Sequence, residues 1–84
     1  MHRTDGQVKR FLTERFGVAG DRVRRDRPLA EVWPGPLCVR ELRAAAEEEF
    51  AVDLAGAELR AGDTVGALVG AIDAGLAESR RAFH

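Results

Sequence analysis

The sequence predicts an all-α fold: a small four-helix bundle with three long helices, one short helix and a long first connection. Three stretches carry apolar residues at helical spacing, and helix start and stop signals flank them. No stretch alternates apolar and polar residues as a half-buried strand would. Because 84 residues suffice for one modest core, we expect one domain over 1–84, with its folded part at about 4–78.

The first helix is expected to begin at Thr4, where Thr4 and Gln7 have the spacing of a capping box. Gly17 follows the last apolar residue and is a suitable stop. The apolar stripe of this helix consists of Val8, Phe11, Leu12 and Phe16.

The connection over 18–35 is long for so small a domain, and Pro28 and Pro34 stiffen it. Its apolar residues are Val18, Val23, Leu29, Val32 and Trp33. We expect these side chains to pack onto the core and hold the connection in place.

The second helix is predicted over Pro36–Phe50, with Gly35 as N-cap and Pro36 as the first helical residue. A proline costs nothing at that position, because its missing N–H would have no partner within the helix. The apolar side of this helix is Leu37, Leu42, Ala45, Ala46 and Phe50.

A short third helix is expected near Gly56–Ala61, and the last helix from about Thr64, with Asp63 or Thr64 as its cap. The last helix is expected to fray over Glu78–His84. Its apolar face is Val65, Leu68, Val69, Ile72 and Leu76.

Composition excludes several classes of protein. Apolar residues make up 45% and charged residues 32%, which is typical of a globular chain. No apolar run is long enough to span a bilayer and no signal-peptide core opens the chain, so we expect a cytoplasmic protein that does not bind membranes. A net charge of −1 argues against nucleic-acid binding.

Nothing in the sequence predicts an enzyme or a metal site. The single cysteine excludes an internal disulfide and a zinc site built from several thiolates. No Ser/His/Asp or Cys/His set is present at a suggestive spacing, and the two histidines, His2 and His84, are both terminal.

Charge is unevenly distributed along the chain. Residues 1–35 hold eight basic and five acidic residues, whereas residues 36–54 hold two basic and five acidic residues. The second helix is therefore the acidic part of the chain. A charge run of this kind most often marks a solvated helix face.

Several motifs in order resemble the acyl carrier protein family. They are RELRAAAEEEF in the second helix, AVDL after it, and DTVGALVGAI at the start of the last helix. The resemblance covers roughly residues 7–76. It implies three long helices and a short one, and a second helix that begins at an Asp-Ser-Leu motif whose serine carries phosphopantetheine.

The sequence departs from this family at the attachment position. Aligning Leu37 with the motif leucine places Gly35 on the aspartate and Pro36 on the serine. Proline has no side-chain oxygen, and the only serine in the chain is Ser79. We therefore expect no bound phosphopantetheine cofactor.

The resemblance implies that the second helix contacts partner enzymes. Here Cys38 stands at a position that is often acidic in the family, and Arg40 and Arg43 stand where apolar residues are common. We expect Arg43 and Glu47 to offset each other in part across one helical turn. The predicted partner-binding residues are Leu37, Cys38, Arg40, Glu41, Arg43, Glu47 and Glu48.

Cys38 and the arginines of the first connection have two interpretations each. Cys38 is either an acylated thiolate, favoured by the helix dipole, or an unreactive small residue. The four arginines Arg22, Arg24, Arg25 and Arg27 either meet an acidic partner or pair with Asp21, Asp26 and the second helix. Trp33 is expected to fill core space, with the added hypothesis that it occupies volume that a carrier would leave for an acyl chain.

The leading functional hypothesis is a non-covalent interaction module: an adaptor, decoy or allosteric subunit for an enzyme of fatty-acid, polyketide or nonribosomal peptide biosynthesis. The alternative is a true acyl carrier protein, attached at Cys38 or with its serine replaced in this chain. A third hypothesis is a helical interaction domain unrelated to carriers. The sequence leaves the pathway and the oligomeric state open.

Overall fold

The computed structural model describes residues 3–82 and the side chains of residues 4–79. Its long secondary-structure elements are all helices. The long helices are α1 (Arg3–Phe16), α3 (Val39–Phe50) and α4 (Val65–Ala82). The first connection contains a 3₁₀ turn, η1 (Gly20–Arg22), and the short helix α2 (Leu29–Val32). No strand forms within the described residues, so the predicted all-α class is confirmed.

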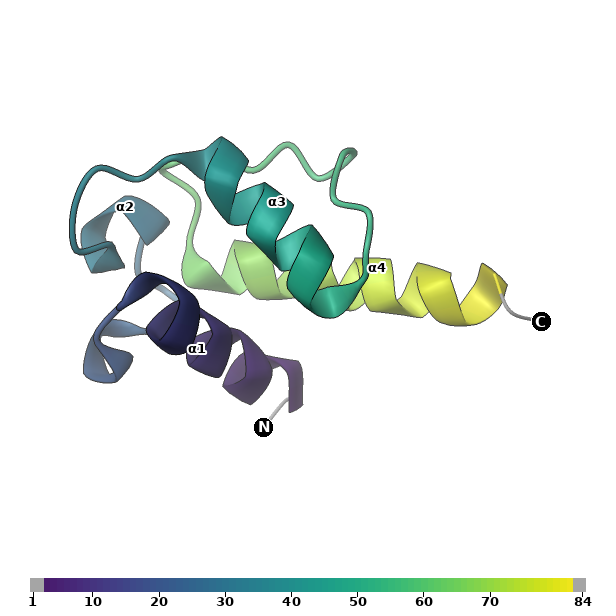
Figure 1. The fold of residues 1–84 in the computed structure, drawn as a ribbon, viewed down its shortest axis with the longest axis horizontal. Helices are drawn as coiled ribbons and strands as arrows, with labels where there is room; N and C mark the ends of the chain where they lie inside the picture. Colours follow the sequence, from purple (N-terminus) through teal and green to yellow (C-terminus); the bar gives the residue numbers. More distant parts are fainter. Residues whose placement is uncertain (1–2, 83–84) are drawn as a thin grey trace.

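The longest helix, α4, runs along the long axis of the molecule, and α1 and α3 both pack against it (Figure 1). The short α2 lies near the C-terminal end of α1 and the N-terminal end of α3 (Figure 1). The core between these helices contains the predicted apolar stripes. Its fully buried large side chains include Val8, Leu12, Val18, Leu29, Val32, Leu42, Leu54, Leu68, Val69 and Ile72.

The predicted role of Thr4 as a helix cap is wrong. The helix already includes Arg3, so Thr4 lies inside the first turn. Its hydroxyl donates a hydrogen bond to Asp73 on α4 and thereby ties the start of α1 to the middle of α4. The stop at Gly17 is confirmed, since Gly17 has φ +70°, a conformation that glycine adopts without strain.

The first connection is more regular than predicted. Val18, Leu29 and Val32 are buried, and Val23 and Trp33 pack half-buried against the core. The burial of Leu29 and Val32 on one side of α2 explains why a short helix forms there, because a four-residue helix gains little from propensity alone.

The predicted start of the second long helix is also wrong, because α3 begins at Val39 instead of Pro36. Cys38 is its N-cap, with an extended backbone (φ −101°, ψ 102°), and the Cys38 carbonyl accepts the N–H of Leu42 at 3.0 Å. Leu37 packs half-buried against the core just before the helix. This tertiary contact outweighs the local suitability of Pro36 as a first helical residue.

The short helix expected near Gly56–Ala61 does not form. Its place is taken by turns in which Glu58 adopts a left-handed conformation (φ 44°). Two aspartates accept backbone N–H groups locally: Asp53 from Ala55 at 2.9 Å and Asp63 from Arg60 at 2.9 Å. Such side-chain bonds satisfy the backbone without a helix.

The last helix begins at Val65, and the predicted cap at Thr64 is confirmed by a bond of 3.2 Å from the Ala67 N–H to Thr64 Oγ1. The first connection completes this cap. The carbonyls of Arg27 and Arg25 accept the N–H groups of Val65 and Gly66, each at 2.9 Å. Instead of fraying from Glu78, α4 remains helical to Ala82.

Candidate functional site

The segment before α3 holds the position where the resemblance implies a carrier's attachment serine. Gly35 and Pro36 are exposed there, in an irregular stretch three residues before the helix begins. Leu37 is half-buried, and Cys38 exposes its thiol at the N-cap. The segment therefore presents one nucleophilic side chain to solvent, the thiol of Cys38, and no hydroxyl.

The hydroxyl groups of the described side chains lie elsewhere. Those of Thr4 and Thr64 are committed to Asp73 and to the N-terminus of α4. Thr13 is exposed on α1, and Ser79 is half-buried near the end of α4. None of these residues belongs to the segment before α3.

The outward side of α3 carries the predicted partner-binding residues. Leu42, Ala45 and Ala46 face the core. The remaining positions divide by exposure: Arg40, Glu41 and Glu48 are exposed, and Arg43 and Glu47 are half-buried. The surface is thus a mixture of both signs of charge.

Glu47 has a structural task that the sequence did not predict. Its Oε2 accepts the backbone N–H of Leu54 at 2.8 Å and so fastens the chain that leaves α3. The expected ion pair between Arg43 and Glu47 is wrong, since no such pair occurs among the described side chains. Glu47 thus has one carboxylate oxygen engaged within the protein, its contact with a partner stays a prediction, and the charge of Arg43 is not offset by it.

The arginines of the first connection pair with neighbours other than those expected. Arg25 forms an ion pair with Asp5 on α1, and Arg27 lies 3.8 Å from Glu31 on α2. Exposed pairs of this kind contribute little to stability. The backbone carbonyls of Arg25 and Arg27 have the clearer role, because they cap α4. Arg22 and Arg24 remain exposed.

Trp33 belongs to an aromatic cluster between α1 and α3. Its ring centroid lies 4.8 Å from that of Phe16, and Phe11 lies 5.6 Å from Phe16 and 5.5 Å from Phe50. Phe11 is buried, whereas Phe16, Trp33 and Phe50 are half-buried. Trp33 therefore packs half-buried at the margin of the core, and the expectation that it fills core space is met in part.

The sequence stripe did not reveal that Phe16 and Phe50 are partly open to solvent. A signal was present, because each is the last residue of its helix and burial is least complete at helix ends. The hollows next to these rings are also lined by Arg15, which the sequence analysis did not single out.

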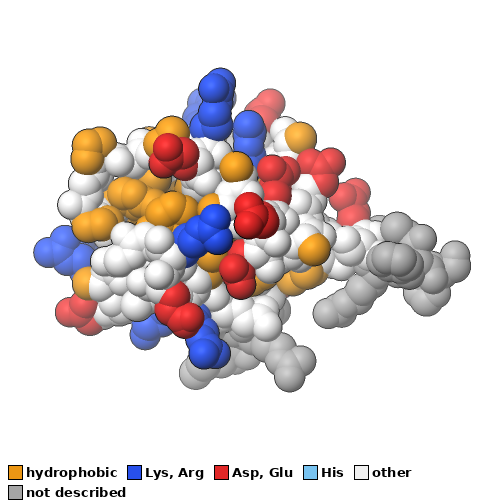
Figure 2. Space-filling view, viewed as in Figure 1, with side chains coloured by type: hydrophobic (Ala, Val, Ile, Leu, Met, Phe, Trp, Pro, Cys, Tyr) orange, Lys and Arg blue, Asp and Glu red, His pale blue; other side chains and the backbone are white. Residues whose placement is uncertain are grey.

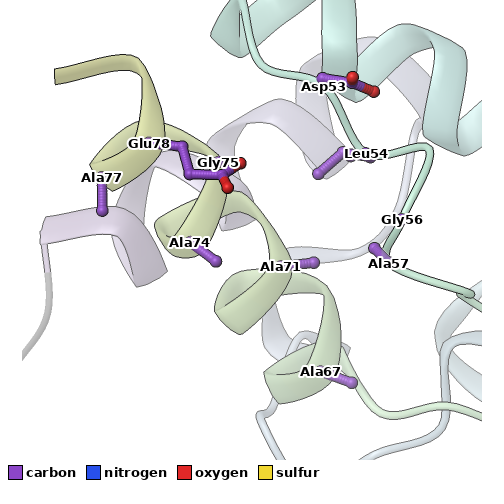
Figure 3. Close-up of a pocket in the computed structure, with 10 residues that line it drawn as sticks. All are labelled: Asp53, Leu54, Gly56, Ala57, Ala67, Ala71, Ala74, Gly75, Ala77 and Glu78. Atoms are coloured by element: carbon purple, nitrogen blue, oxygen red, sulfur yellow. The ribbon is translucent and has the colours of Figure 1, made fainter. Parts of the chain in front are cut away.

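A third hollow, of about 710 Å³, lies between α4 and the segment over 53–57 (Figure 3). Four alanines of α4 line one side, and Leu54, Gly56 and Ala57 lie on the other. Among the described residues, Asp53 and Glu78 are the charged ones that line it. The alanines are Ala67, Ala71, Ala74 and Ala77.

The described residues contain no cluster of His, Cys, Asp or Glu suited to a metal ion. Every buried side-chain nitrogen and oxygen in this part of the chain has a hydrogen-bond partner. No helix over 3–82 combines the length and apolarity needed to cross a membrane. The chain matches no protein-family model, no curated protein and no solved structure.

Proposed function

We propose that this protein is a carrier-protein-like interaction module that binds its partner without carrying an acyl group. Two placements support the proposal: the glutamate-rich stretch lies on α3, and the Thr64-Val65 pair lies at the start of α4. Three long helices around one core support this reading. The short helix does not support it, because α2 lies before α3, whereas the short helix was expected after the second long helix.

One observation carries the non-covalent part of the proposal. Pro36 stands at the position that the resemblance assigns to the attachment serine, and neither its side chain nor that of Gly35 offers an oxygen that could form a phosphodiester. Gly35 and Pro36 are exposed, so it is their residue type, and not burial, that prevents attachment of phosphopantetheine here.

The partner that the resemblance favours is a cytosolic enzyme of fatty-acid, polyketide or nonribosomal peptide assembly, with this protein as its adaptor, decoy or allosteric subunit. The exposed side chains of Cys38, Arg40, Glu41 and Glu48, with half-buried Arg43, form the contact surface. Arg40 and Arg43 favour acidic groups on the part of the partner that faces them, whereas Glu41 and Glu48 favour basic groups opposite them, because charge complementarity sets association rate and specificity.

Covalent carriage remains a second candidate because the thiol of Cys38 is exposed. Intact-mass spectrometry separates the two candidates. The protein is incubated with coenzyme A and a promiscuous phosphopantetheinyl transferase, alongside protein isolated from its native host. We expect no mass gain in either sample. A gain of one phosphopantetheine or acyl unit that disappears in Cys38→Ala would establish the second candidate instead.

The contact surface is tested with the double variant Arg40→Glu/Arg43→Glu. Crosslinking of the protein in its native host identifies the bound enzyme. The affinity of that enzyme for the unaltered protein and for the double variant is then measured by calorimetry. We expect the affinity to fall at least about tenfold, roughly 1.4 kcal/mol. Arg22→Glu/Arg24→Glu is the matched control: it makes the same charge change on exposed residues of the first connection. Equal losses in both variants would refute the assigned surface.

A further inference from the structure

Two adjoining hollows form one groove between α1 and α3. Their volumes are about 490 Å³ and 300 Å³, and Arg15 lines both. Both helices that border the groove, α1 and α3, pack against α4. Figure 2 shows hydrophobic side chains gathered on this face near α2 and the first half of α3, with acidic side chains toward the end of α3.

The floor of the groove is aromatic. Phe11 and Phe50 line one hollow, and Phe16 lines the other. Phe16 and Phe50 keep part of their rings exposed, and Trp33 extends the aromatic surface beside Phe16. Partly exposed aromatic rings gathered on one face are typical of protein-binding surfaces, since they bury a large apolar area on contact.

The two walls of the groove carry opposite charge. On the α3 side, Glu41, Glu48 and Glu49 are exposed. On the α1 side, Arg10 is paired with Glu14 at 3.0 Å, whereas Arg15 has no ion pair within the part of the chain described. An occupant would therefore need a basic row along α3 and an acidic group facing Arg15.

We infer that this groove binds an amphipathic helix of a partner protein. The apolar seam of that helix lies on Phe11, Phe16 and Phe50, its lysine or arginine row faces α3, and its acidic side faces α1. This is the helix-in-groove mode of recognition, in which an apolar stripe is read at helical spacing. The inference rests on the proposed function, because it names the kind of segment with which the partner contacts α3.

Other occupants fit less well. A free acyl chain would leave the charged walls unmatched. A second copy of this protein could offer only part of an apolar seam from its described long helices, since most of each stripe of α1, α3 and α4 is packed in the core. A partner's helix satisfies the floor and both walls at once.

The probe is a designed helical peptide of about five turns, with a leucine seam, lysines along one flank and glutamates along the other. The control peptide has the two flanks exchanged and is otherwise identical. Binding is followed by the fluorescence of Trp33, the only tryptophan, and by amide chemical shifts. We expect the first peptide to bind at least about tenfold more tightly than the control. The shifts should centre on Phe16, Glu48 and Phe50.

A second test changes only charges on exposed side chains, so that its result does not depend on altered folding. Glu41→Lys/Glu48→Lys changes two exposed side chains and should reduce or reverse the preference between the two peptides. Glu58→Lys/Glu78→Lys, the matched control, makes the same charge change at exposed positions outside the groove and should leave the preference intact.

Equal binding of the two peptides, or shifts centred elsewhere, would overturn the inference. So would concentration-dependent dimerisation in sedimentation velocity that Glu41→Lys/Glu48→Lys abolishes, because the occupant would then be a second copy. The groove assignment and the proposed function can fail independently of each other. If the peptides show no preference while Arg40→Glu/Arg43→Glu still weakens the native enzyme complex, only the groove assignment falls.

Discussion

Gly75 lies at the closest approach of α4 to the segment that leaves α3. A methyl group built on Gly75 would lie 2.8 Å from the Cβ of Val52, closer than two such atoms pack. Val52 is itself buried, so it has little room to move away. The absence of a side chain at Gly75 thus allows α3 and α4 to share one core.

Gly75→Ala should destabilise the protein by about 1–3 kcal/mol, because overpacking forces neighbouring side chains or backbone to shift. Gly70→Ala is the control. It lies on the same helix, is exposed and has no atom within 4 Å of an added methyl group. It should stabilise by up to about 1 kcal/mol through helix propensity. Urea unfolding of both variants checks this, and a loss of stability of similar size in the two would contradict the packing argument.

Residue type also decides what the segment before α3 can do. Gly35 and Pro36 present no reactive oxygen, and that conclusion needed only the sequence. The position of Cys38 needed the structure, because it is the N-cap of α3 and not part of its first turn. The role of Glu47 also needed the structure. Its residue type predicted a carboxylate that faces a partner, and the hydrogen bond that it accepts from the Leu54 N–H adds a structural role.

At the scale of the elements, the end of α3 is unusual. Ala51 caps it in the left-handed conformation, with φ 54° and ψ 47°, and donates its N–H to the carbonyl of Glu47. Glycine is the residue usually found at such a position, because a Cβ disfavours it. The buried Val52 and Leu54 that follow require the chain to turn there, and this explains why an alanine is held in that conformation.

Ala51→Gly should therefore stabilise the protein, by about 0.5–1 kcal/mol, because the relief of the left-handed conformation exceeds the extra freedom of glycine in the unfolded chain. The same substitution at Ala44, exposed in the middle of α3, should destabilise by about 1 kcal/mol. Thermal unfolding of the two variants provides the check. A loss of stability in both would mean that the turn at Ala51 stores no strain.

The long helices were predictable from the sequence because their apolar residues recur at the period of a helix. The ends and the short elements were not predictable to the same degree. At Pro36 and Gly56–Ala61, local signals allowed a helix, yet contacts of Leu37 and local bonds of Asp53 and Asp63 favoured other backbone conformations. Such propensity differences amount to about 1 kcal/mol, which one tertiary contact or capping bond can exceed.

At the scale of the whole molecule, the two long connections hold each other. Leu29 donates its N–H to the Asp63 carbonyl at 2.8 Å, and Val65 and Gly66 donate theirs to carbonyls of the first connection. Pro28 and Thr64 form an isolated antiparallel bridge at the same place. These contacts join segments that are far apart in the sequence, so the connections are expected to open only when the core opens.

Hydrogen exchange checks this expectation. The amides of Leu29, Val65 and Gly66 should exchange as slowly as the core amide of Leu42, through global unfolding. The amide of Cys38 makes no hydrogen bond within the described residues and should exchange fast. If the amides of Val65 and Gly66 exchanged much faster than that of Leu42, the connections would open independently of the core.

The sequence by itself determined the all-α class, the apolar core residues except Val52 and Leu54, the acidic character of α3 and the lack of a hydroxyl at Pro36. These properties depend on residue type and spacing alone. The tertiary structure decided where α3 begins, that α2 lies in the first connection, which carbonyls cap α4, and that Phe16 and Phe50 form the floor of a groove. Each of these depends on contacts between distant segments, whose energies outweigh the small local preferences that a sequence pattern expresses.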